Sequence, residues 1–239
     1  ITQTLQEYAE SQGLYYPVDF ASAGSSHIGG NIATNAGGIK VLRYGMTREW
    51  IAGLKVVTGN GDLLEVNKGL VKNATGYDLR HLMMGAEGTL GVITAAALRL
   101  SPLPAGEGTA LFVVESPRAA LDLLSLARDH LGEGISAFEL MHRQGLEFLA
   151  ETLPDIRQPF DVAPEWFVLI DLGLARGIDP ATALEAVFAQ GFDAGLVSDG
   201  LIAQSEAQRH AFWEIREQIP EANRRIGSVS SHDISLPLS

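Results

Sequence analysis

The chain has 239 residues, of which 46% are hydrophobic and 19% are charged, and this balance is typical of a folded protein rather than a disordered one. Its formal net charge of −12 at pH 7 would repel nucleic-acid phosphates and anionic membrane surfaces, so neither is an expected partner. It contains no cysteine, which excludes disulfides, thiolate metal sites and cysteine nucleophiles and fits a cytoplasmic location.

The two ends of the chain suggest a truncated protein. No apolar run is long enough to span a bilayer, and no basic region followed by an apolar stretch opens the sequence, so we expect neither a transmembrane segment nor a signal peptide. The chain begins with Ile1 and stops at Ser239, shortly after a predicted strand. We therefore expect that segments are missing at both ends.

The N-terminal part of the chain is predicted to contain a strand hairpin between short helices. The pair Asn60-Gly61 is a strong hairpin-turn signal between two apolar runs. In chain order, the periodicities predict a helix at 2–12, strands at 51–58 and 62–66, a helix at 77–84 and a strand at 91–100. The run from Gly29 to Gly38 shows neither strand nor clear helix periodicity, so no regular element is predicted there.

Ser101-Pro102-Leu103-Pro104 is the predicted domain boundary, because two prolines in this stretch cannot continue a central strand. We expect one domain at 1–103 and another at 104–239. In the second domain the patterns predict strands at 109–115, 135–141, 166–172, 195–198 and 230–236, and helices at 117–130, 143–152, 180–190 and 205–219. The repeated strand–helix unit favours a ferredoxin-like α/β sandwich.

Two glycine-rich segments are the candidates for binding. The first, Ile28-Gly-Gly-Asn-Ile-Ala-Thr-Asn-Ala-Gly-Gly38, combines glycines, which allow a ligand close to the backbone, with amide and hydroxyl side chains. The second, Gly85-Ala-Glu-Gly-Thr-Leu-Gly-Val-Ile93, follows the word Asn-Ala-Thr-Gly-Tyr-Asp-Leu79. Single glycines here are explained by tight turns, helix caps or a strand bulge, but the clusters are not. The first segment matches neither a Walker loop nor a strand–GxGxxG–helix fingerprint.

The words IGGNIATNAGG, LRYG, NATGYDL and GAEGTLGVIT, in this order, closely resemble the FAD-binding domain (PCMH type) of the vanillyl-alcohol-oxidase-like flavoproteins. The branch that they resemble contains D-2-hydroxyglutarate dehydrogenase, D-lactate dehydrogenase and the glycolate oxidase flavin subunit. Beyond Leu103, the words SAFELM, FWEIRE and HDISLP resemble the substrate (cap) domain of FAD-linked oxidases. The resemblance implies an α+β protein: the second half of the FAD-binding domain, then a ferredoxin-like cap domain, truncated at both ends.

The resemblance also implies roles for residues at matching positions. Arg216 would bind the substrate carboxylate, a role that suits a planar guanidinium, and His232 is a candidate substrate contact. An isolated arginine at 216 would instead be explained by a helix-surface pair with Glu217 or Glu221. The positions that would line the FAD pocket are Gly29, Gly30, Asn31, Thr34, Asn35, Gly37, Gly38, Glu87, Gly88, Gly91 and Ile93.

Several expected parts of the family pattern are absent or changed. The glycine-rich pyrophosphate loop should precede Ile1, and the catalytic base and the ligands of a divalent metal such as zinc should follow Ser239. No catalytic residue and no metal ligand is therefore assigned within the chain. Ser231 and Pro220 stand where the D-2-hydroxyglutarate branch has a lysine and a second polar contact, which weakens the case for 2-hydroxyglutarate as substrate. Asp233 is adjacent to His232 but would point to the opposite face of a strand.

The resemblance implies an FAD-dependent dehydrogenase that oxidises a small D-2-hydroxy acid to the 2-oxo acid by hydride transfer to flavin. Electrons would pass to a separate acceptor such as an electron-transfer flavoprotein or a quinone, and a homodimer is compatible with the sequence. We expect the isolated chain not to hold FAD tightly or to turn over. Two alternatives remain open: a flavin oxidase of the same superfamily acting on another alcohol or an amine, and a non-catalytic α/β assembly or ligand-binding module.

Overall fold

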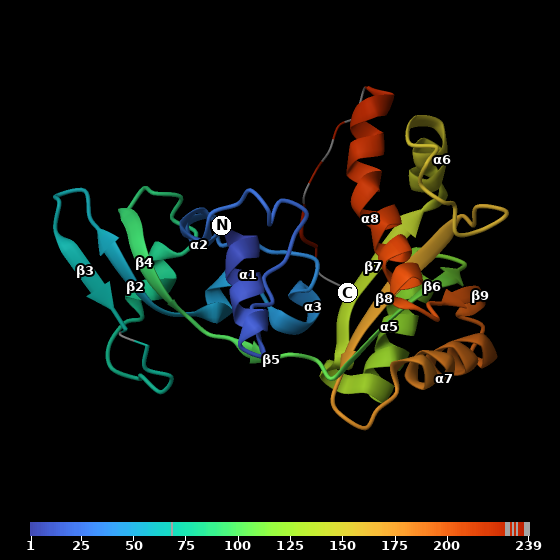
Figure 1. Cartoon of the computed structure of the whole chain (residues 1–239), viewed down its shortest axis with the longest axis horizontal. Coiled ribbons are helices and arrows are strands. Elements are labelled where there is room, and N and C mark those ends of the chain that lie inside the picture. Colours follow the sequence, from blue (N-terminus) through green and yellow to red (C-terminus); the bar gives the residue numbers. More distant parts are fainter. Residues whose placement is uncertain (68, 228–229, 231, 233, 237–239) are drawn as a thin grey trace. The chain divides into compact units, whose positions relative to one another are not determined.

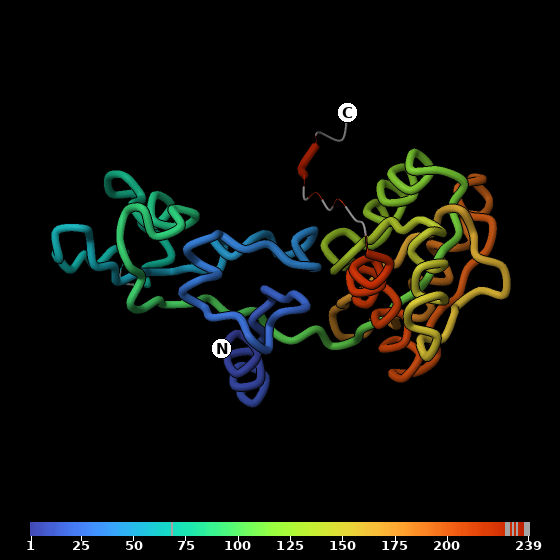
Figure 2. The backbone as a smooth tube through the Cα atoms, turned by 90° about the horizontal axis from the view of Figure 1, so that it is seen from above, coloured from blue at the N-terminus to red at the C-terminus, as the bar shows by residue number. Residues whose placement is uncertain are grey.

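The computed structural model describes residues 1–67, 69–227, 230, 232 and 234–236 (Figures 1 and 2). The chain divides into two units, and each is described by itself. Unit 1 comprises Ile1–Ala105, Glu133–Ala137 and Gly173–Arg176, and unit 2 comprises Gly106–Gly132, Phe138–Leu172 and Gly177–Ser239. The chain enters unit 2 directly after the proline-containing segment, but two short later segments belong to unit 1. The division into 1–103 and 104–239 stays a prediction.

Unit 1 is built on a three-stranded antiparallel sheet in the order β3-β2-β4. The predicted hairpin turn is confirmed, because Gly61 has φ +85° and its N–H donates to the carbonyl oxygen of Thr58 at 2.9 Å. A short pair, β1 with β5, forms a separate two-stranded sheet. The elements of unit 1 are α1 (Thr2–Ser11), β1 (Leu14–Tyr15), α2 (Ile28–Thr34), α3 (Val41–Tyr44), a 3-10 helix (Thr47–Trp50), β2 (Ile51–Val57), β3 (Leu63–Val66), α4 (Leu79–Met83), β4 (Val92–Leu98) and β5 (Ser101–Pro102).

The core of unit 1 lies between α2 and one face of this sheet. Strand β2 turns Leu54 and Val56 into the core, whereas Lys55 points outward and forms an ion pair with Glu65 of β3 at 2.7 Å. Helix α2 contributes Ile32, which is fully buried. The core residues are Ile32, Ile51, Leu54, Val56, Val66 and Met84.

Helix α2 corrects the expectation that the run from Gly29 to Gly38 contains no regular element. Its glycines give it a weak intrinsic helix propensity, and the burial of Ile32 supplies tertiary stabilisation that no sequence window contains. The helix ends at Asn35, which takes the left-handed conformation with φ 48° and ψ 51°. Asparagine is one of the few residues other than glycine that tolerates this helix ending.

Unit 2 contains a four-stranded sheet in the order β7-β8-β6-β9, with β6 antiparallel to β9. Its elements are β6 (Gly106–Val114), α5 (Pro117–Leu131), a 3-10 helix (Gly132–Gly134), β7 (Ile135–His142), α6 (Arg143–Thr152), β8 (Trp166–Leu174), α7 (Pro180–Asp193), β9 (Val197–Ile202) and α8 (Glu206–Ile226). In chain order, the first and third strands of this sheet (β6 and β8) are central, and the second and fourth (β7 and β9) are at its edges. This order confirms the predicted ferredoxin-like sandwich, with α6 as an additional helix.

Helices cover both faces of this sheet. Leu111 of β6 packs with residues of α6 and α8, in a core that includes Leu146, Leu149 and Ile215. The next residue, Phe112, points to the opposite face, where its ring lies 5.4 Å from that of Phe188 in α7. This alternation follows from the two-residue period of a strand and explains why β6 is an almost continuous apolar run.

The C-terminal part of unit 2 differs from the sequence prediction in two ways. Helix α8 continues to Ile226 instead of ending at Ile219, and it contains Pro220 in its interior. Buried Ala222 lies beyond the proline, so packing compensates for the lost backbone hydrogen bond. The strand predicted at 230–236 lies partly outside the described residues, and the described residues of that range are not in a strand.

Candidate functional site

The two glycine-rich segments, residues 28–38 and 85–91, lie side by side in unit 1. The N–H of Gly85 donates to the carbonyl oxygen of Ile32 at 3.2 Å, and the N–H of Glu87 donates to that of Ala33 at 2.8 Å. Helix α2 also packs against β4, which directly follows the second segment (Figure 1). Backbone from two separate parts of the sequence therefore forms one continuous surface, as a shared binding wall requires.

The polar side chains of the first segment serve the fold. Asn31 is buried, and its amide donates to Thr2 Oγ1 at 2.7 Å. Asn35 accepts from the N–H of Arg48 at 3.0 Å, while Thr34 donates to the carbonyl oxygen of Gly30 within its own helix at 3.0 Å. These side chains hold α2 in place. They would therefore help to bind a ligand by positioning the backbone of α2, not by donating to the ligand themselves.

The glycines of the two segments divide into two kinds. A Cβ at Gly38 would overlap with the carbonyl oxygen of Asp19, and one at Gly91 would lie 2.6 Å from that of Val57, so both glycines allow close packing of the protein against itself. Gly30 and Gly88 are exposed, and a Cβ on either would meet no atom within 4 Å. The sequence alone does not separate these two kinds, and only the second leaves bare backbone open to a ligand.

The remaining predicted cofactor positions are less open or differently placed. Gly29 lies beside β4, where its Cβ would be 3.8 Å from the carbonyl oxygen of Ile93, and a Cβ on Gly37 would be 3.5 Å from the side chain of Val41. Ile93 itself packs on the core of unit 1. Glu87 is exposed and has φ 49°, a left-handed conformation that is unusual for glutamate. The turn at Glu87 brings the following residue, Gly88, to the surface.

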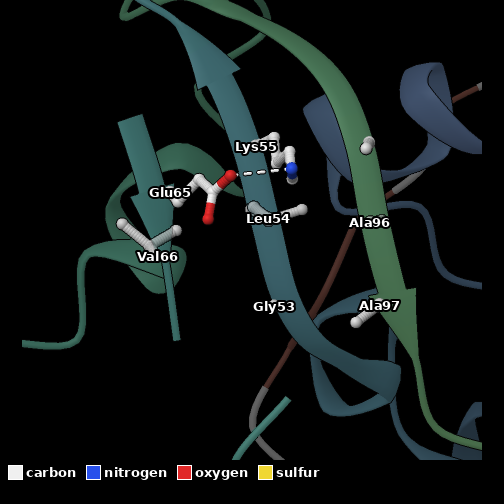
Figure 3. Close-up of a pocket in the computed structure, with 8 residues that line it drawn as sticks. Gly53, Leu54, Lys55, Glu65, Val66, Ala96 and Ala97 are labelled. Carbon is white, nitrogen blue, oxygen red and sulfur yellow. Dashed lines mark ion pairs between the residues drawn. The ribbon is translucent and has the colours of Figure 1, made fainter. Parts of the chain in front are cut away.

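A hollow of about 310 Å³ lies on the sheet of unit 1 (Figure 3). Its lining includes Leu54 and Val66 from neighbouring strands, alanines of β4, and the ion pair of Lys55 with Glu65. None of the predicted site residues lines it. The hollow therefore adds no support to the predicted cofactor positions.

The segment 73–78 precedes α4 and is anchored by a charged pair. Asp78 is the N-cap of α4, and its carboxylate accepts from Arg80 Nε at 2.9 Å. This hydrogen bond is the main reason that the pKa of the Asp78 carboxyl is lowered. Arg80 Nη1 also donates to the carbonyl oxygen of Ile51 at 2.8 Å, which ties the helix to β2. Tyr77, by contrast, is 95% exposed.

Arg216, the predicted carboxylate-binding residue, lies in α8 of unit 2 and pairs with a strand residue. Its Nε donates to the carboxylate of Glu139 in β7 at 2.9 Å, and the two side chains are 28% and 26% exposed. Of the two helix-surface partners considered from the sequence, Glu221 pairs with Arg224 and Arg225. Sequence reasoning missed Glu139, although it lies within the SAFELM word that carried part of the resemblance.

Further polar contacts join α8 to the same sheet. Buried Asp171 of β8 accepts from Thr109 Oγ1 at 2.6 Å and from Trp213 Nε1 at 3.1 Å. Arg209 pairs with Glu107 at 2.9 Å, and its Nη1 lies 3.7 Å from the Asp171 carboxylate. Because these partners belong to β6 and β8, they fix both the position and the rotation of α8.

His232, the other predicted substrate contact, is exposed, and its Nε2 lies 2.8 Å from Ser230 Oγ. Asp233 lies outside the described residues. In the part of the chain that the structure describes, no group of three or more histidine, aspartate or glutamate side chains could hold a metal ion. No helix among the described residues is long and apolar enough to cross a membrane.

Comparison with protein families identifies the chain. Residues 103–239 match the family of FAD linked oxidases, C-terminal domain, and residues 1–67 match the FAD binding domain family. The chain belongs to the FAD-linked oxidases. The resemblance to the vanillyl-alcohol-oxidase-like flavoproteins is thereby confirmed, as is the order of an FAD-binding part followed by a cap domain.

Curated relatives of this FAD-linked oxidase include D-2-hydroxyglutarate dehydrogenases. The protein of Stutzerimonas stutzeri (strain A1501) is 47% identical over 223 residues, which cover 92% of this chain and 47% of the relative. The mitochondrial protein of Bos taurus is 39% identical over 238 residues, covering 100% of this chain and 43% of the relative. The chain thus spans about half the length of the curated relatives it matches.

Solved structures share the fold of this oxidase at low identity. An alkyldihydroxyacetonephosphate synthase aligns with a TM-score of 0.64 and 20% identity over 94% of this chain and 44% of its own. A p-cresol methylhydroxylase with substrate bound aligns with a TM-score of 0.62 and 13% identity over 91% of this chain and 46% of its own. These likenesses show the fold alone.

Proposed function

We propose that the protein expressed from its complete gene oxidises a small D-2-hydroxy acid to the corresponding 2-oxo acid with FAD as cofactor. The observation that carries this proposal is the joining of the two glycine-rich segments into one backbone surface on a chain of the FAD-linked oxidase family. The names of the curated relatives support a 2-hydroxy acid as the class of substrate.

The open glycines provide a test of whether this surface fits a flavin. A flat ring system can approach backbone closely only where no side chain projects, and Gly30 and Gly88 meet that condition. The left-handed turn at Glu87, whose N–H donates to the carbonyl oxygen of Ala33, holds Gly88 in place. These residues fit the group, which would supply the acceptor for the hydride of the substrate C2.

Arg216 is proposed to bind and orient the substrate through its carboxylate. The protein carries a net charge of −12, so an anionic substrate needs a local cation. A guanidinium offers two parallel N–H donors that match the two oxygens of a carboxylate. Fixing this group would hold the α-carbon, and with it the hydrogen to be removed, in one orientation. No residue of the chain is assigned as the base that accepts the hydroxyl proton.

The identity of the acid is a finer question. The named relatives make D-2-hydroxyglutarate the first candidate. Pro220 is exposed in α8 and has neither a side-chain donor nor a backbone N–H, so it offers nothing to a second carboxylate. Ser231, the other departure, lies outside the described residues. D-lactate, D-malate and glycolate therefore belong in the same panel.

The proposal is tested by expressing the complete gene and recording the visible spectrum of the purified protein. We expect a yellow flavoprotein that reduces an artificial dye with at least one acid of the panel. Electrons would leave to a separate acceptor such as an electron-transfer flavoprotein or a quinone, so we expect slow turnover with oxygen. A colourless folded protein would contradict the proposal, and rapid peroxide formation would favour an oxidase instead.

Arg216 variants test the substrate-binding role. Arg216→Lys keeps the positive charge but loses the planar pair of donors, whereas Arg216→Ala loses both. We expect the KM for the acid to rise in the order wild type, lysine, alanine. An unchanged KM in Arg216→Ala, with normal flavin content, would show that the carboxylate binds elsewhere.

A further inference from the structure

We propose that Glu139 is a positioning residue for the substrate: it holds Arg216 by Nε so that the two terminal amino groups of that arginine are presented to a carboxylate. The inference rests on the proposed function, in which Arg216 binds the substrate. It assigns a role to a strand residue that lies behind the binding group.

The geometry separates the two sides of the Arg216 guanidinium. Nε donates to Glu139 at 2.9 Å, and in the described part of the chain this is the hydrogen bond that Arg216 makes. A guanidinium carries one N–H at Nε and four at the Nη atoms, so the terminal edge retains a full pair of parallel donors. With 28% of its side chain exposed, Arg216 remains accessible to a small anion.

A second arginine on the same helix shows what a purely structural pairing looks like. Arg209 lies about two turns earlier on the face of α8 that meets the sheet. Its Nε and both Nη atoms face carboxylates of Glu206, Glu107 and Asp171, and its side chain is 17% exposed. Among the described residues, Arg209 has three acidic partners from its own unit, whereas Arg216 has one.

The support behind Arg216 is rigid on both sides. Glu139 projects from β7, in which Ala137 and Met141, each two residues away from it, are buried, so its backbone is held by the sheet. On the helix side, Trp213 is tied to Asp171 and Ile215 is buried, which fixes the rotation of α8 at Arg216. A long arginine side chain otherwise samples many rotamers, and this freedom would have to be lost on binding. An anchor at Nε removes much of that cost before the substrate arrives.

The test compares Glu139 with Glu107 in the protein from the complete gene with its flavin bound. Glu139→Gln keeps the shape and a neutral acceptor, whereas Glu139→Ala removes the anchor. Glu107→Gln and Glu107→Ala remove the matching partner of Arg209, and thus loosen the same helix without touching Arg216. KM and kcat are measured for the preferred 2-hydroxy acid, with circular dichroism and Tm as checks on folding.

We expect Glu139→Gln to raise KM about threefold and Glu139→Ala about tenfold, with kcat within about twofold of wild type, because the lost contact serves binding and orientation. We expect the Glu107 variants to leave KM within about twofold while lowering Tm by amounts similar to those of the Glu139 variants. If the alanine variant does not fold, the isosteric glutamine variant carries the test.

Four outcomes would overturn the inference. Equal KM values in the Glu139 and Glu107 variants would show a structural salt bridge only. A lower KM in Glu139→Gln would show that Glu139 competes with the substrate for Arg216. An unchanged KM in Arg216→Ala would instead show that the substrate carboxylate binds elsewhere, and would overturn the proposed role of Arg216 and this inference with it. A KM raised by Arg216→Ala but not by either Glu139 variant would leave the proposed function intact and refute only the role of Glu139.

Discussion

Two glycines of the first glycine-rich segment should respond in opposite ways to the same substitution. Gly30→Ala adds a methyl group to the interior of α2 where no atom lies within 4 Å, so the fold has room for it. Replacing glycine by alanine inside a helix stabilises by about 0.5–1 kcal/mol. Gly38→Ala places the same methyl group against the carbonyl oxygen of Asp19, and the displacement that this forces should cost about 1–3 kcal/mol.

The assay separates folding from cofactor binding. Urea denaturation followed by circular dichroism gives the free energy of unfolding of each variant, and titration of the apoprotein from the complete gene with FAD, followed by flavin fluorescence, gives the Kd. If the flavin lies against bare backbone at Gly30, the stabilised Gly30→Ala variant should bind FAD at least about tenfold more weakly.

The two variants are expected to change stability in opposite directions, so each result tests a different part of the reasoning. A Gly30→Ala variant that is more stable and binds FAD as well as wild type would refute the placement of the cofactor at α2. A Gly30→Ala variant that is less stable would refute the open space around it. A Gly38→Ala variant as stable as wild type would contradict the close packing on Asp19.

Other consequences of the structure can be measured as well. Asp171→Ala should lower the free energy of unfolding, measured in urea, by about 3 kcal/mol, because buried Thr109 and half-buried Trp213 lose their acceptor. The exposed control Asp122→Ala should cost less than about 0.5 kcal/mol. Pro220→Ala should raise the free energy of unfolding by about 1–3 kcal/mol, since it restores a backbone donor inside α8; a lower Tm would contradict this. Because the pKa of Asp78 is lowered by its bond to Arg80, its contribution is present above the ordinary value of 3.8 and is lost as pH falls through the lower folded-state value. Acid titration should therefore show a stability loss below about pH 4 that is smaller in Asp78→Asn.

Unit 2 could be predicted closely because its signals are local. Pro117 and Pro180 follow Ser116 and Asp179, whose side chains accept the N–H groups of Ala119 and Thr182, so each helix start is encoded within four neighbouring residues. Strands of continuous apolar residues between such helices suffice for the α/β sandwich.

The sequence predictions were wrong where residues distant in sequence determine the local structure. Helix α2 depends on the burial of Ile32 against β2, and the continuation of α8 past Pro220 depends on Ala222 in the core of unit 2. The same holds for the candidate site. The resemblance places both glycine-rich segments along one cofactor, and they are adjacent. It does not predict that Asn31 turns toward Thr2, which lies 29 residues earlier in the sequence. The spacing of residues along the chain does not predict which partner the Asn31 side chain binds.

The strand order of unit 2 has a consequence for how this part of the chain acquires its structure. The first strand to leave the ribosome, β6, has β8 and β9 as its sheet neighbours, and the second strand, β7, does not touch it in the ladder. A nascent chain that ends between His142 and Trp166 therefore holds two strands of this sheet with no neighbour to pair with. Assembly of the sheet has to wait for the third strand, and Gly106–Val114 is the segment that depends most on protection from aggregation until then.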